Sequence, residues 1–236
     1  TTTSVNLAAS LAASGKRILL VDLDPQANAT MGSGTNKQTV KTTIYHVLLG
    51  DAAVQAARIT GTQGKYDLIP ANRDLAGAEV EMVDLPQREA RLKTALEAIE
   101  FDYDYILIDC PPALNLLTLN GLCAAHAVMI PMQCEYYALE GLSDLVNTIK
   151  RVRNNFNPAL RIEGLLRTMF DPRNILAQQV SDQLQKHFGD KVYRTVIPRN
   201  IRLAEAPGFG LPVLYHDAQS KGALAYLELA KEILDA

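Results

Sequence analysis

The sequence lacks several features that would assign it to a particular class of protein. It has three cysteines, an odd number, and no two of them form a Cys-x-x-Cys motif. This argues against a disulfide framework and is typical of a protein of the reducing cytosol. No run of about 18 apolar residues occurs, since the most apolar stretch, Leu122 to Met132, contains His126 and Pro131, so no membrane-spanning helix is expected. A signal peptide is also lacking, but the sequence opens on Thr1 rather than a start methionine, and we expect residues upstream of it.

The chain has no overall positive charge. Its formal net charge of −3 at pH 7 argues against a generally basic nucleic-acid coat or a membrane-surface protein. The charge is unevenly distributed, because residues 150–202 hold 11 Lys and Arg against 4 Asp and Glu, a net of +7, and the remainder carries −10. Two interpretations stay open here: an anionic partner for this basic region, or a solvated surface whose charges pair with one another.

Length and composition predict one domain, because 236 residues of which 48% are hydrophobic can bury one large core. Strand-like and helix-like segments alternate, which is typical of an α/β fold with a single doubly wound, mostly parallel sheet and helices on both faces. The predicted strands are Arg17–Asp22, Tyr105–Asp109, Ala127–Pro131, Ile162–Met169 and Val192–Pro198, with Tyr66–Pro70 as a weaker candidate. The predicted helices are Thr2–Ser14, Leu75–Val83, Arg88–Ile99, Leu116–Ala124, Leu139–Asn154, Ile175–Phe188 and Ala223–Leu234.

Carboxylates follow two of these strands, at the sheet edge where ligands of such folds bind. Asp109 ends an apolar strand and precedes two prolines, so its carboxylate is placed to hold Mg²⁺ through water beside the phosphates of a nucleotide. Asp22 and Asp24 point to one side while the strand persists, and we favour Asp24 as functional because it lies further into the loop. The alternative is that both residues only end the strand and turn the chain.

The threonines Thr1 to Thr3 open the first helical segment. A helix N-terminus offers free N–H groups to an anion, and a threonine there ligates Mg²⁺ in phosphate-binding loops. Taken alone, the cluster favours a simple helix cap.

Five segments together resemble the successive motifs of the ParA/Soj-type partition ATPases, which are P-loop proteins of the deviant Walker A, MinD-like type. The segments are GKRILLVDLDPQANAT, YDYILIDCPPALNLLTLNGLCAA, VMIPMQCEYYALEGLSDLVNTI, TMFDPRNILAQQV and VIPRNIRLAEAPGFGLPVLYHDAQSKGALAYLELAKEI. They occur in the family's order over nearly the whole chain, and five in register are highly specific. The resemblance implies a slow, partner-stimulated ATPase of chromosome or plasmid partition, with ATP and Mg²⁺ as cofactors.

The sequence departs from the family at its first residue. Family members carry a strand and a glycine-rich loop, KGG followed by GK or a similar pair, immediately before the threonines, and neither is present here. We therefore expect residues 1–236 to form a single ParA-like ATPase domain whose N-terminal strand and phosphate-binding loop lie upstream of Thr1. Without that strand, the centre of the sheet is expected to be open.

The resemblance also assigns roles at the nucleotide. Thr1 would ligate Mg²⁺ and Thr2 would contact a phosphate. Asp24 matches the catalytic switch aspartate that positions water near the metal, and Asp109 matches the Walker B aspartate that holds Mg²⁺.

Further roles follow from the later motifs. Met169 and the residues Pro198, Arg199 and Asn200 resemble the segments that frame the adenine. Glu135–Tyr137 would lie near a dimer interface, with packing in the core as the alternative for the two tyrosines. Within the basic region, the resemblance implies non-specific contacts to DNA phosphates, for which we select Arg173, Arg199 and Arg202, each with a surface ion pair as the alternative role.

The implied partners are non-specific double-stranded DNA, a ParB/Spo0J-type protein and, in the ATP-bound state, a second copy of the chain. The implied location is the cytoplasm, in association with the nucleoid, and no membrane partner is expected.

Three alternatives remain. A MinD-like regulator of cell division would end in a basic amphipathic helix, whereas the tail AYLELAKEILDA holds three acidic residues and one lysine. An iron–sulfur reductase would need two well-placed cysteines per chain, whereas Cys110, Cys123 and Cys134 fit buried structural thiols better. A binding module without a phosphate loop would not hydrolyse ATP.

Overall fold

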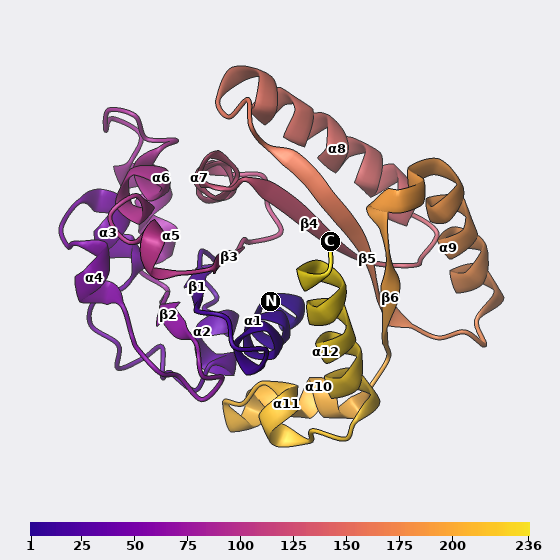
Figure 1. Ribbon diagram of the computed structural model, residues 1–236. Coiled ribbons are helices and arrows are strands. Elements are labelled where there is room, and N and C mark those ends of the chain that lie inside the picture. Colours follow the sequence, from indigo (N-terminus) through magenta and orange to yellow (C-terminus); the bar gives the residue numbers. More distant parts are fainter.

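The computed structural model describes residues 1–236 and contains parallel strands covered by helices on both faces (Figure 1). The strands are β1 Ile18–Asp22, β2 Asp67–Ile69, β3 Tyr105–Asp109, β4 Ala127–Gln133, β5 Arg161–Phe170 and β6 Val192–Pro198. The helices of nine residues or more are α1 Thr2–Ala13, α7 Leu116–Ala124, α8 Ala138–Asn155, α9 Ile175–Phe188 and α12 Lys221–Leu234. Shorter helices connect them: α2 Asn28–Gly32, α3 Ile44–Leu49, α4 Val54–Ala57, α5 Leu75–Glu81, α6 Arg91–Leu96, α10 Ile201–Glu205 and α11 Val213–His216. Three 3₁₀ turns complete the chain: η1 Glu100–Asp102, η2 Gly189–Lys191 and η3 Ala206–Phe209.

The strands form two parallel three-stranded groups, in the orders β2-β1-β3 and β4-β5-β6. The predicted α/β class with helices on both faces is confirmed, but the six strands are not one continuous ladder. No strand of the chain lies between β3 and β4, so no strand forms hydrogen bonds with the edges of β3 and β4 that face away from their own groups. Most residues of these two strands are only half-buried. The two groups are therefore not joined by hydrogen bonds between β3 and β4.

Side-chain alternation in β1 assigns the two faces of the first group. Ile18 and Leu20 pack in one core with α1 and α12, whereas Leu19 and Val21 pack in a second core with α3 to α7. A third core lies between β4–β6 and the helices α8 and α9. All five residues of β1 are buried, which agrees with the continuous apolar run that predicted the strand.

The ends of the longer helices follow from local chemistry. Helix α1 ends before Gly15, whose φ of 83° lies in the left-handed region that glycine adopts without strain. The Ser220 side chain accepts from the Ala223 N–H and so caps the start of α12. No helix is both long and apolar enough to cross a bilayer.

Candidate active site

The first turn of α1 contacts the end of β3 through side-chain hydrogen bonds. Thr1 Oγ1 donates to Asp109 Oδ2 at 2.8 Å, and Ser4 Oγ donates to Asp109 Oδ1 at 2.6 Å. Residues three apart on a helix share a face, so both hydroxyls reach the same carboxylate. Asp109 is only 3% exposed. The structure thus brings together Thr1 and Asp109, which the sequence assigned to one site, while the neighbouring Thr2 side chain is exposed and makes no hydrogen bond within the chain.

The loop after β1 is anchored by a buried aspartate. Because β1 and β3 pair in register, Asp22 lies opposite Asp109 at the carboxyl edge of the sheet. Asp22 Oδ2 accepts from the Thr30 N–H at 2.8 Å and the Thr30 hydroxyl at 2.7 Å, and Oδ1 accepts from the Asp24 N–H at 3.1 Å. Burial, with a smaller contribution from the charge of Asp109, raises the pKa of Asp22 to about 6, against the opposing effect of these hydrogen bonds. Asp22 is therefore the residue that positions the loop.

Asp24 lies within this loop and is 8% exposed. Its Oδ1 accepts from the Gln26 N–H at 2.9 Å, and its carbonyl accepts from the Ala27 N–H at 2.8 Å. Ala27 is fully buried with φ of 54°, a left-handed conformation that costs an alanine about 1–2 kcal/mol and that the surrounding packing must impose. No hydrogen bond joins the Asp24 side chain to Thr1 or Asp109.

The oxygen ligands at this edge suit Mg²⁺. Hydroxyl and carboxylate oxygens are the donors that this hard cation takes, and it commonly binds proteins through one or two carboxylates while keeping several waters and substrate phosphates. The chain has no group of three or more His, Cys, Asp or Glu residues arranged to hold a metal ion. The start of α1 adds free N–H groups for a phosphate.

The residues predicted to frame the adenine lie together at the ends of β5 and β6. Phe170 pairs with Pro198, and the Arg199 N–H donates to the Phe170 carbonyl at 3.3 Å, so the two strand ends stay adjacent. Met169 is 43% exposed with φ of 50°, which turns its side chain out of the regular strand pattern. The Asn200 side chain accepts from the Leu203 N–H and caps α10. Asn200 therefore has a structural role whether or not it also touches a base.

The segment that follows Asn200 is fixed to α1. Leu203 and Ala206 lie in the same core as Val5 and Ala8 of α1, and the Asn6 side chain accepts from the Val213 N–H at 2.7 Å. The first helix thus connects the Thr1–Asp109 pair to the region after β6. Beyond β4, Tyr136 and Tyr137 are 73% and 74% exposed and stack edge to face, so they are surface residues rather than core residues.

The three arginines selected for DNA differ in their surroundings. Arg173 pairs with Asp171 at 2.8 Å, and this guanidinium lowers the pKa of the Asp171 carboxyl to about 2. Arg202 contacts Glu205 at 2.8 Å and Asp217 at 3.2 Å. Arg199 is exposed and forms no ion pair.

Sequence reasoning missed two side chains of the site. Ser4 had a usable signal, because it follows Thr1 by three residues on a helix. Thr30 had no such signal in the sequence, because it lies in α2, eight positions after Asp22, and its contact with Asp22 depends on how the intervening loop folds. Cys123 and Cys134 are buried as predicted, whereas Cys110 is half-buried. Burial raises the pKa of Cys110 to about 12 and of Cys123 to about 11, so these thiols stay protonated.

Comparisons with known proteins identify the family. A family model described as an AAA domain matches residues 1–162. The sequence is 55% identical over 233 residues to the sporulation initiation inhibitor protein Soj of Bacillus subtilis, covering 99% of this chain and 92% of that protein. It is 50% identical over 236 residues to the chromosome partitioning protein ParA of Caulobacter vibrioides, covering 99% of this chain and 88% of that protein. A solved structure from Mycobacterium smegmatis, described as cobyrinic acid a,c-diamide synthase with bound ADP and magnesium, matches with a TM-score of 0.86 and 38% identity over 99% of this chain and 87% of that one. The chain therefore belongs to the AAA-domain family and, within it, to the ParA/Soj-type partition ATPases.

Proposed function

We propose that the protein binds ATP and Mg²⁺ at the carboxyl edge of its sheet and hydrolyses ATP as the nucleotide switch of a DNA partition system. The observation that carries the proposal is the hydrogen bond between Thr1 and Asp109 at the N-terminus of α1. A hydroxyl and a carboxylate held together beside free helix N–H groups are the ligands that a magnesium–phosphate complex requires. The Mycobacterium smegmatis structure with ADP and magnesium, which has the same fold, supports this assignment.

Each residue of the site then has one task. Thr1 and Asp109 would hold Mg²⁺, and Thr2 would contact a phosphate oxygen. Mg²⁺ bound there would supply positive charge that offsets the negative charge of the phosphates. Asp24 would position the attacking water, while Asp22 and Thr30 hold the Asp24 loop in place. Met169, Pro198, Arg199 and Asn200 border the adenine.

The switch acts through association. In our proposal ATP favours a homodimer, because a nucleotide bound between two copies stabilises only the dimeric state. That dimer binds double-stranded DNA without sequence preference through Arg173, Arg199 and Arg202, and a ParB/Spo0J-type protein accelerates an otherwise slow hydrolysis and so releases it. The names of the Soj and ParA relatives, which refer to sporulation and chromosome partition, support a role in partition. In our proposal the protein acts in the cytoplasm, on the nucleoid.

The apolar face of α12 is not free to bind a membrane. Tyr226, Leu229 and Ala230 of α12 are at most 1% exposed and pack in the same core as α1. An interfacial anchor must bury its apolar face in the membrane, but this face of α12 is already occupied inside the protein.

The test is an Asp24→Asn variant of the full-length gene product, with Asp84→Asn as a control at an exposed aspartate. We expect unchanged ATP affinity and a loss of hydrolysis of about 100-fold or more, because only the placement of water is affected. Nucleotide binding is measured with a fluorescent ATP analogue and hydrolysis by phosphate release. Full hydrolysis in Asp24→Asn would remove Asp24 from the mechanism.

A further inference from the structure

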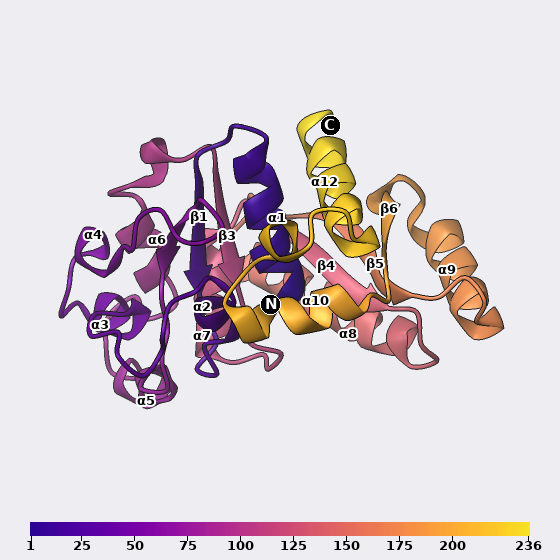
Figure 2. The same cartoon turned by 90° about the horizontal axis from the view of Figure 1, so that it is seen from below.

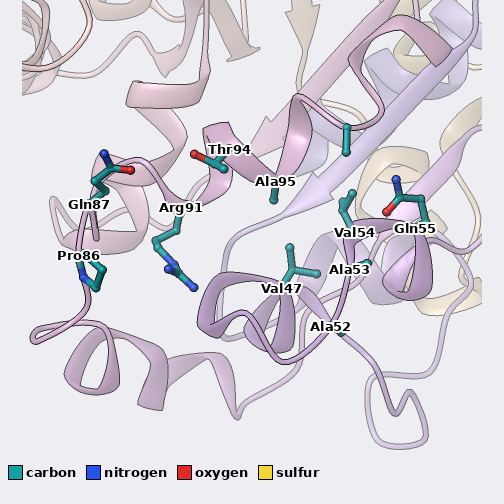
Figure 3. A pocket seen from close by; sticks show the side chains of 11 residues that line it. Val47, Ala52, Ala53, Val54, Gln55, Pro86, Gln87, Arg91, Thr94 and Ala95 are labelled. Carbon is teal, nitrogen blue, oxygen red and sulfur yellow. The ribbon is translucent and has the colours of Figure 1, made fainter.

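A cavity lies on the flank of the molecule remote from β6. Helices α3, α4 and α6 enclose it, and in Figures 1 and 2 they lie on the opposite side of the molecule from β6 and α9. Its volume is about 310 Å³. The buried side chains Val47 and Val54 form part of its wall, and the alanines Ala52, Ala95 and Ala98 leave space where larger residues would fill it (Figure 3).

Arg91 is the one charged residue that lines this cavity. In Figure 3 its side chain extends from α6 toward the α3 side. Its Nε donates to the Leu48 carbonyl at 2.7 Å, but no carboxylate of the chain pairs with it and neither Nη atom has a hydrogen-bond partner within the chain. Gly50 makes this position possible, because a Cβ at residue 50 would lie 2.9 Å from Nη2, and its φ of 87° is left-handed. A half-buried guanidinium thus faces the cavity with donors to spare.

The walls of the cavity are fixed by buried hydrogen bonds. The Asn120 side chain, which is fully buried, accepts from the Leu92 N–H and donates to the Arg88 carbonyl, and so holds the start of α6 against α7. On the other wall, the Asp51 and Ala52 N–H groups both donate to the His46 carbonyl and fold the loop back onto α3. A preformed cavity binds at a lower entropic cost than one that must be ordered by its ligand.

The rim of the cavity indicates what kind of ligand fits. Five exposed residues lie at its edge: the polar residues Gln55, Gln87 and Thr94 and the apolar residues Ala53 and Pro86. Because the rim is open, the cavity would not enclose a free small molecule to the usual extent. A peptide could instead place its side chains in the cavity while its backbone stays at the polar rim. The interior offers one cation and an otherwise apolar surface, so the complementary group is one carboxylate beside one apolar side chain.

We propose that this cavity binds a peptide segment of a partner protein that presents an apolar side chain next to an aspartate or glutamate. The apolar side chain enters between Val47 and Ala95, and the carboxylate receives hydrogen bonds from the Nη atoms of Arg91. This site is separate from Thr1, Asp24 and Asp109, so occupancy does not depend on the nucleotide role of those residues.

The experiment uses amide NMR shifts of the full-length protein titrated with the peptide Ac-Ala-Leu-Glu-Ala-NH₂. We expect saturable shifts of the amide signals of residues 44–55 and 86–98. Two control peptides, one with Gln in place of Glu and one with Ala in place of Leu, should bind at least tenfold more weakly. Isovalerate at equal concentration should not displace the peptide. Arg91→Gln is expected to weaken binding at least tenfold, whereas Lys93→Gln, an exposed cation of the same helix that does not line the cavity, leaves it unchanged.

A second variant separates binding from the support that Arg91 gives to α3. Ala95→Leu fills the cavity from α6, one turn beyond Arg91, keeps Arg91 in place, and is expected to abolish peptide binding without lowering the melting temperature. Equal binding of the Glu and Gln peptides, absence of saturable shifts at the cavity, or binding retained by Ala95→Leu would each overturn the proposal. Isovalerate binding as tightly as the peptide would also overturn it, since the ligand would then be a free small carboxylate.

Discussion

Replacing Thr30 by valine tests whether buried hydrogen bonds hold the loop that carries Asp24. Thr30 is fully buried, and its hydroxyl donates to Asp22 at 2.7 Å while it accepts from the Ala71 N–H at 2.9 Å. Valine has nearly the same shape, so no cavity forms and the loss is confined to these two bonds. Losing the bond to a carboxylate costs about 1.5–3 kcal/mol, and leaving the Ala71 N–H unsatisfied costs about 1–3 kcal/mol. We therefore expect the free energy of unfolding to fall by about 3–5 kcal/mol.

Urea denaturation at pH 7 measures this change, with Thr39→Val as a matched control at an exposed position whose effect should stay within about 0.5 kcal/mol. ATP hydrolysis should also fall more than ATP binding, because the Asp24 backbone is held by Asp22. A loss of stability below about 1 kcal/mol would refute the argument, since the two bonds would then be worth less than an ordinary net hydrogen bond each.

Three further predictions follow from other parts of the structure. Arg202→Ala should weaken binding to DNA of any sequence and reduce the salt slope by about 1, and an unchanged slope would leave Arg202 with only its pairing to Glu205 and Asp217. Because the folded-state pKa of Asp22 is about 6, above its usual value of 3.8, the carboxyl stabilises the fold most below pH 3.8 and this contribution is lost as pH rises through 6. Between pH 3.8 and 6, the free energy of unfolding of the wild type should therefore fall by up to about 3 kcal/mol relative to that of Asp22→Asn, as measured by denaturation. Parallel pH profiles of stability for the two proteins would contradict the raised pKa of Asp22. Gly222→Val should lower stability by about 1–3 kcal/mol, because a Cβ there lies 2.6 Å from Leu203 Cγ, while Gly141→Ala, with open space around it, should not.

The long elements were predictable because they span enough residues for periodicity to show. The bounds of β3, β6, α7 and α9 match the prediction, and those of α1, β1 and α8 differ by at most one residue at each end. The helices α2, α3, α4, α10 and α11 were missed because each has only four to six residues, which is too short for an apolar repeat. Helix α6 starts at Arg91 rather than at Arg88. The Asn120 side chain of α7, which is far away in the sequence, holds the turn between Arg88 and Leu92, and no local sequence pattern reveals that contact.

The candidate site was only partly predictable for a similar reason. Asp22 and Asp109 end neighbouring parallel strands, so their approach follows from the fold class. The partners that fix them, Thr30 and Ser4, depend on how the loop and the first helix turn pack. The ion pairs of Arg173 and Arg202 could not be derived either, because exposed charges have many candidate partners and the sequence does not rank them.

We propose that ATP controls association with DNA through this site. The direct measurement is retention of the full-length protein on random-sequence duplex DNA at several salt concentrations, in ATP and in ADP, with Asp24→Asn measured beside the wild type. We expect salt-sensitive retention in ATP only, and retention of Asp24→Asn that persists because the nucleotide is not hydrolysed. Equal retention in ATP and ADP, or none in either, would contradict a nucleotide switch.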